Sequence, residues 1–111
     1  MKRSSKVESA EILSQIIKSN NPRLRKHLIL GLPDSVIKLI CEVMHNILQG
    51  NVPIRGKQRE KFQKYKHTIR LLGKGPFKPL VKKRKTLVNQ RGGFIGTILP
   101  IIASILLSSN V

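Results

Sequence analysis

The chain has 111 residues, a formal net charge of +17 and a single cysteine. This length suits one small domain or a domain with tails, and the lone cysteine excludes an internal disulfide and a zinc site built on thiolates. The excess of 22 Lys and Arg over 5 acids favours a polyanionic partner. Nucleic acid is the first candidate, an anionic membrane surface the second, and a merely solubilising charge excess the third.

The first two expected helices are short. Within residues 1–21, apolar side chains recur at helical spacing, and these are Ile12, Leu13, Ile16 and Ile17. Ser9 could cap this helix, and its N-terminal flank lacks the continuous apolar stretch of a secretory signal. Pro22 then stands at a first helical position, and Gly31 ends the second helix. An intracellular, reducing environment fits these features.

The strongest helical pattern runs over residues 34–49. Its apolar side chains form two neighbouring rows, namely Val36, Ile40, Val43 and Ile47, and Ile37, Met44 and Leu48. A stripe this wide predicts packing against more than one neighbour, so we expect this helix to be the core element. Cys41 falls inside the pattern, which favours a small buried hydrophobe over a nucleophile.

A long basic helix is expected over residues 55–72. Its apolar residues form a narrow seam of Phe62, Tyr65, Ile69 and Leu72, and its only acid is Glu60. Surface helices normally alternate charge signs, so this composition favours phosphate contacts over a merely solvated face. Lysine-rich helices with few Asn or Gln contact the nucleic-acid backbone rather than read base edges.

Charge divides the chain into segments. Residues 55–91 carry 14 Lys and Arg against one acid, whereas residues 92–111 carry no charge. The predicted fold class is all-α, a small helical bundle of three to four helices at about 9–72, followed by a basic linker and an apolar C-terminal helix or tail. The predicted segments are a polar N-terminal segment (1–21), a bundle with a basic last helix (22–73), a Gly/Pro-containing linker (74–93) and a tail (94–111).

The basic residues of the third helix and the linker are the predicted nucleic-acid contacts. The "KKRK" run at 82–85 also fits a nuclear import signal or an anchor beside a membrane. The predicted contacts are Arg55, Lys57, Arg59, Lys61, Lys64, Lys66, Arg70, Lys78, Lys82, Lys83, Arg84, Lys85 and Arg91.

The apolar tail must be covered, since a stretch this apolar would aggregate in water. Three coverings stay open: a partner protein, which we favour, a membrane entered obliquely, and the protein's own core. A helix over 94–107 would be about 21 Å long, shorter than the roughly 30 Å of a bilayer core. The candidate contact residues are Phe94, Ile95, Ile98, Leu99, Ile101, Ile102, Ile105, Leu106 and Leu107.

Enzymatic chemistry is not expected. The three histidines lie on different predicted helices with no metal-ligand spacing, and neither "GKG" nor "RGG" has the frame of a phosphate loop. We therefore predict no catalytic residue, no metal site and no cofactor.

The order of three sequence motifs along the chain resembles that found in a known protein family. "ICEVMHNILQGNVPI", "KQREKFQKYKHTIRLL" and "RGGFIGTILPIIASILL" follow one another across a lysine-rich segment. This plan resembles the small basic late proteins of Maverick/Polinton elements and adintovirus-like viruses. It is similar to that of the adenovirus core precursor mu, or protein X, a cationic DNA-condensing peptide. The resemblance covers about residues 22–109. It implies a virion and host-nucleus location, with double-stranded DNA and capsid or core proteins as partners.

A maturation-protease motif fits the same family. The adenovirus-type protease cuts after (Met/Ile/Leu)-x-Gly-x before Gly, and Leu71, Gly73, Lys74 and Gly75 match this pattern. A match by chance is the other interpretation. If the match is real, the protease is a further partner and cuts between Lys74 and Gly75.

The predicted function is non-enzymatic, sequence-independent DNA condensation by a virion core or minor structural protein that links the genome to a capsid or membrane. One alternative is a membrane-active viral protein, whose basic run binds anionic lipid while its tail inserts. Another is a helical DNA-binding regulator, which would prefer one DNA sequence.

Overall fold

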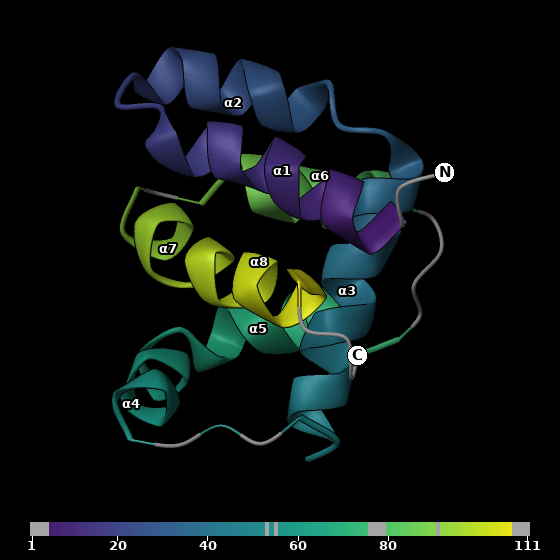
Figure 1. The fold of residues 1–111 in the computed structure, drawn as a ribbon, viewed down its shortest axis with the longest axis vertical. Coiled ribbons are helices and arrows are strands. Elements are labelled where there is room, and N and C mark those ends of the chain that lie inside the picture. Colours follow the sequence, from purple (N-terminus) through teal and green to yellow (C-terminus); the bar gives the residue numbers. More distant parts are fainter. Residues whose placement is uncertain (1–4, 53, 55, 76–79, 91, 108–111) are drawn as a thin grey trace.

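The computed structural model describes residues 5–52, 54, 56–75, 80–90 and 92–107. Within them the chain forms eight helices and no strand, which confirms the all-α class with more helices than expected (Figure 1). The helices are α1 (Ser5–Lys18), α2 (Pro22–Leu30), α3 (Asp34–Leu48), α4 (Lys57–Lys64), α5 (Lys66–Gly73), α6 (Leu80–Val88), α7 (Gly92–Thr97) and α8 (Leu99–Leu107).

The ends of α2 follow from local chemistry. The Asn21 side chain accepts hydrogen bonds from the backbone N–H groups of Arg23 and Leu24 at 2.9 and 3.3 Å, as an N-cap does. Pro22 takes the first helical position, where its missing N–H costs nothing. At the other end the N–H of Gly31 donates to the carbonyl of His27.

Helix α3 is the central element, as its wide stripe predicts. Val36, Ile37, Ile40, Cys41, Val43 and Met44 are all buried. Different parts of this surface contact α5, α6 and α8. Against α5 the approach is very close, because a Cβ on Gly73 would lie 2.8 Å from the Met44 carbonyl carbon and 2.9 Å from the His45 nitrogen. The Nδ1 atom of His45 also lies 3.0 Å from the Gly73 carbonyl oxygen.

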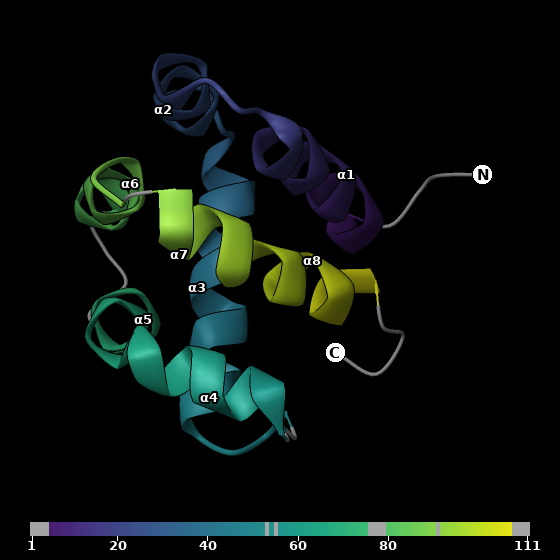
Figure 2. The same ribbon diagram turned by 90° about the vertical axis from the view of Figure 1, so that its left-hand side faces the viewer.

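The basic helix expected at 55–72 is broken at Tyr65, whose φ of −109° and ψ of 23° separate α4 from α5. The Tyr65 ring meets the Phe94 ring edge to face, with centroids 5.6 Å apart. Aromatic pairs favour this arrangement, and the contact ties the break to the C-terminal helices. Figure 2 shows α4 running in front of α3 while α5 lies to one side.

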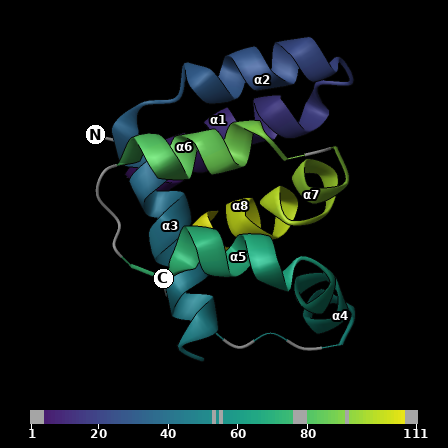
Figure 3. The same cartoon turned by 180° about the vertical axis from the view of Figure 1, so that it is seen from behind.

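Residues 80–88 form helix α6 where a linker was expected. Figures 2 and 3 show α6 between α2 and α5, and it also contacts α3. Leu87 and the aliphatic stem of Lys83 face the interior. The predicted linker at 74–93 is therefore wrong for residues 80–88, because α6 belongs to the packed bundle.

The apolar tail is the centre of the core. Phe94, Ile95, Ile98, Leu99, Ile101, Ile102 and Leu106 are buried, and Ile105 is partly buried. Helix α8 lies against α1 on one side and α3 on the other, as Figures 1 and 2 show. Of the predicted contact residues only Leu107 is exposed, at 59%. The favoured interpretation, docking on a partner, is wrong for this fold, because the tail's own helices cover it.

Pro100 explains the break between α7 and α8. Pro100 is the second residue of α8. In the first turn of a helix the backbone N–H that proline lacks would have no carbonyl partner within that helix. Hydrogen bonding continues around it, from the Ile98 N–H to Phe94 and from the Ile102 N–H to Ile98. No single helix in the described residues has the length and hydropathy to cross a bilayer; only Leu80–Val88 taken together with Gly93–Leu107 does, across a 97° bend.

Candidate nucleic-acid interface

Three consecutive helices, α4, α5 and α6, carry a cluster of exposed cations, which we call the cationic face. Its side chains are Lys57, Arg59, Lys61, Lys64, Lys66, Arg70, Lys74, Lys82 and Lys85, all exposed. Glu60 is the only acid between residues 55 and 91. Figure 3 turns α5 and α6 to the viewer, with α1 behind them and α4 beyond the end of α5 and farther from the viewer.

The spacing on α5 places two cations in one row. Lys66 and Arg70 lie four residues apart, which aligns side chains along one side of a helix. Lys74 was predicted only as part of a protease site. It is the C-cap of α5, with an extended backbone of φ −99° and ψ 140°, and its place directly after the basic helix is the sequence signal that could have assigned it to this face.

Lys83 and Arg84 differ from the other predicted contacts. Lys83 is only 6% exposed, and its ammonium group donates hydrogen bonds to the carbonyl oxygens of Leu71 and Lys74, the latter at 2.8 Å. These carbonyls belong to the C-terminal end of α5, which has the negative end of the helix dipole. Lys83 therefore holds α6 against α5.

Arg84 likewise holds α6 against α2. Its Nη1 atom donates to the carbonyls of Ile29, Leu30 and Leu32 at 3.2, 3.2 and 2.6 Å. Its Nη2 atom donates to Asp34 at 2.6 Å. The Arg84 side chain is 17% exposed, so its charge is directed into the fold. The prediction that Lys83 and Arg84 contact phosphate is thus wrong for this structure, because both cations satisfy helix ends.

The "KKRK" run is consequently divided. Lys82 and Lys85 are exposed on the cationic face, whereas Lys83 and Arg84 fasten it to the bundle. Three further predicted contacts, Arg55, Lys78 and Arg91, lie outside the described residues.

The predicted protease site is held in place. Gly73 is buried against α3, and the carbonyls of Leu71 and Lys74 accept from Lys83. Leu71 and Gly75 are exposed. A protease needs an extended, accessible strand of substrate, which the bonded end of α5 does not offer in this fold.

Cys41, the other candidate for a reactive group, is a packed core residue. Cys41 is buried, and burial raises the pKa of its thiol to about 11, an effect that the charge of Lys83 partly offsets. A thiol in this state is a poor nucleophile. Among the described residues no group of three His, Cys, Asp or Glu is placed to hold a metal ion.

None of the family models, curated proteins and solved structures compared with this chain matches it.

Proposed function

We propose that this chain binds double-stranded DNA without sequence choice through its cationic face, as a non-enzymatic core protein that neutralises a packaged genome. The observation that carries the proposal is the set of nine exposed Lys and Arg side chains, eight on three consecutive helices and one, Lys74, at the C-cap of α5, with one acid in this part of the chain. The order of motifs along the chain, which resembles that of small basic viral core proteins, supports the virion and the host nucleus as its locations.

The chemistry of the face favours the phosphate backbone over base edges. Most of its cations are lysines, which act as point charges on flexible stems. Each phosphate that they neutralise releases condensed counterions, and this release supplies the affinity of non-specific binding. Lys83 and Arg84 fasten α6 to α5 and α2, so the backbone that carries Lys82 and Lys85 is already ordered and less conformational freedom is lost on binding.

The membrane-active alternative gains no support from the fold. The side chains that would insert into lipid form the core between α1 and α3. Insertion would have to expose this core to the bilayer and leave α1 without its main packing partner.

The proposal is tested by fluorescence anisotropy with two duplexes of equal length and unrelated sequence. We expect affinities that agree within about twofold and fall by orders of magnitude between 50 and 200 mM salt. A strong preference for one duplex would support a sequence-specific regulator instead. Absence of binding at low salt, combined with dye release from anionic liposomes, would support the membrane-active alternative.

A further inference from the structure

A small pocket lies where the start of α2 meets the end of α6 and α7, and we call it the Arg25 pocket. Its volume is about 60 Å³. Sites for drug-sized ligands have roughly 300–1,000 Å³, so this pocket suits a single small group. The polar side chains that line it are Arg25, Lys26 and Gln90, and its other lining residues are apolar. Figure 3 shows the start of α2, the end of α6 and α7 on the right-hand side of the molecule, where α5 also begins.

The Arg25 pocket has positive charge and no compensating acid. Among the described residues that line it there is no Asp or Glu, and helices α2, α6 and α7, which form it, contain none. The nearest acid before α2 in the chain is Glu11, which lies seven residues, about 10 Å of helix, before the end of α1. The nearest acid after α2 is Asp34, which pairs with Arg84. A cavity lined by two cations and no carboxylate attracts an anion.

Arg25 has a donor that the fold does not use. Its Nε atom is buried and has no hydrogen-bond partner among the described residues. A buried donor without an acceptor destabilises a folded protein, because it has lost its bond to water and gained none. Arg84, in contrast, donates to three carbonyls and to Asp34. The fold holds Arg25 beside the pocket without satisfying it, as expected of a side chain that binds a ligand.

Helix α6 does not need Arg25 as a cap, although its end lies beside the pocket. The Thr86 carbonyl accepts a hydrogen bond from the Gln90 side chain at 2.9 Å, and the Leu87 carbonyl accepts from the Gln90 backbone N–H at 3.1 Å. Gln90 therefore has at the end of α6 the structural role that Arg84 has at the end of α2.

Gln90 also connects the Arg25 pocket to the cationic face. Its Oε1 atom accepts a hydrogen bond from the Thr68 hydroxyl of α5 at 3.2 Å. Lys66, an exposed cation of that face, lies two residues before Thr68, and Lys26 is exposed on α2. A duplex that lies along α5 therefore has the Arg25 pocket beside it.

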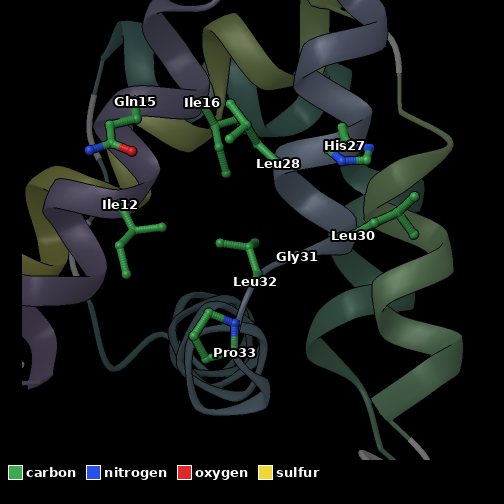
Figure 4. Close-up of a pocket in the computed structure, with 9 residues that line it drawn as sticks. All are labelled: Ile12, Gln15, Ile16, His27, Leu28, Leu30, Gly31, Leu32 and Pro33. Carbon is green, nitrogen blue, oxygen red and sulfur yellow. The ribbon is translucent and has the colours of Figure 1, made fainter.

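The groove between α1 and α2 is not a comparable site. Its volume is larger, about 600 Å³, but no Lys or Arg is among the described residues that line it. Figure 4 shows apolar side chains such as Ile12 and Leu28 on its walls, with Gln15 and His27 as its polar groups. This groove offers no Lys or Arg to a phosphate, so the smaller pocket is the better anion site.

We propose that the Arg25 pocket binds one phosphate group of the DNA backbone, so that a bound duplex reaches from α5 across the end of α6 to α2. This inference rests on the proposed function and adds a site to it. The Arg25 guanidinium turns onto the phosphate and donates two N–H groups to its oxygens, as arginine forks do, and Lys26 adds a second positive charge. The unpaired donor of Arg25 gains its acceptor only in the complex.

Arg25→Met tests the site, because methionine keeps a long side chain and removes its donors. We expect duplex affinity to fall about tenfold at low salt, and the slope of log K against log salt to become shallower by about 0.9, the amount for one phosphate contact. In the absence of DNA the melting temperature should stay equal or rise, because the unpaired donor is gone. A melting temperature that falls while the slope stays unchanged would overturn the proposal, since Arg25 would then only support the fold.

Arg23→Met is the matched control. Arg23 is exposed on the same helix and does not line the pocket, so its substitution removes the same charge outside the site. We expect it to change the slope by less than half as much as Arg25→Met does. Equal changes would overturn the proposal, because net charge alone would then explain both.

The source of the phosphate is tested with a DNA hairpin prepared with and without a terminal phosphate. We expect Arg25→Met to weaken binding of both hairpins equally. A loss confined to the phosphorylated hairpin would overturn the assignment to the backbone, since the pocket would then hold a terminal phosphate.

The variant Lys66→Gln/Arg70→Gln separates this inference from the proposed function. If the parent chain binds no duplex at low salt, the proposed function fails and this inference fails with it. If Lys66→Gln/Arg70→Gln flattens the slope and Arg25→Met does not, the cationic face binds DNA and only the Arg25 pocket is refuted.

Discussion

The ammonium group of Lys83 donates a 2.8 Å hydrogen bond to the carbonyl oxygen of Lys74, so one cation of the basic segment holds the backbone of another. Lys74 itself is exposed on the cationic face, whereas Lys83 is buried. In this protein some cations, such as Lys83, hold helices together, and other cations are exposed on those same helices.

Replacing Lys83 and Lys82 separately should distinguish these two tasks. Lys83→Met leaves the carbonyls at the end of α5 without their charged donor, and we expect it to lower the free energy of unfolding by about 2 kcal/mol. Lys82→Met should change stability by less than about 0.5 kcal/mol but weaken DNA binding. Urea unfolding and anisotropy measure the two effects. A larger loss of stability in Lys82→Met than in Lys83→Met would contradict these separate roles.

Arg84 and Asp34 should contribute unequally although they form one ion pair. Arg84→Ala removes donors from three carbonyls, and we expect a loss of about 3 kcal/mol. Asp34→Ala should cost less than about 1 kcal/mol, because the Asp34 side chain is 77% exposed and exposed pairs contribute little. Chemical denaturation of both variants measures the difference. Equal losses would mean that the ion pair, and not the capping of α2, is what Arg84 provides.

The predictable parts of this fold are those in which local sequence and packing agree. Pro22 and Gly31 mark α2 correctly, and the wide stripe of α3 identifies the core helix. Helix α6 was missed because its inward residues include Lys83 and Arg84, which a hydrophobic pattern assigns to the surface. Only the carbonyls of α5 and α2, distant in sequence, explain why these cations turn inward.

The tail shows a different limit of sequence reasoning. Its apolar composition requires a cover, but the sequence does not say which one. The main cover is α1, which ends 76 residues before the tail begins. Likewise, nothing local marks the break at Tyr65, since the ring that it meets, Phe94, belongs to α7.

Gly73 should be intolerant of even one added methyl group. Gly73→Ala places a Cβ 2.8 Å from the Leu48 Cδ1 atom and from the Met44 carbonyl carbon, and we expect a loss of about 1–3 kcal/mol from overpacking. Gly96→Ala is the matched control, because nothing lies within 4 Å of its added Cβ. There alanine should stabilise α7 by up to about 1 kcal/mol. Thermal unfolding compares the two, and a neutral Gly73→Ala would show that α3 and α5 are not closely packed.

Burial of Cys41 predicts a loss of stability at high pH. The pKa of this thiol is about 11 in the folded chain against an ordinary value of 9.0, so the folded state holds the proton more tightly than the unfolded state. The resulting stabilisation is present below pH 9 and is lost as the pH rises toward 11. Cys41→Ala should therefore show a shallower decline of unfolding free energy over this range than the parent. Parallel declines would mean that the thiol does not contribute.

Reaction of Cys41 with a thiol reagent provides an independent check on the same burial. In native buffer modification should be slow and limited by opening of the core, and in urea it should be fast. Rapid modification without denaturant would place Cys41 at the surface.

The central claim, that the cationic face binds phosphates, is tested most directly by the salt dependence of DNA affinity. The slope of log K against log salt should be steep for the parent chain. For Lys66→Gln/Arg70→Gln it should be shallower by about 1.8, the amount expected for two phosphate contacts. Lys18→Gln/Lys38→Gln removes the same charge from exposed positions on α1 and α3 and should leave the slope unchanged. If both double variants flatten the slope equally, net charge alone explains the binding, and the cationic face is not the site.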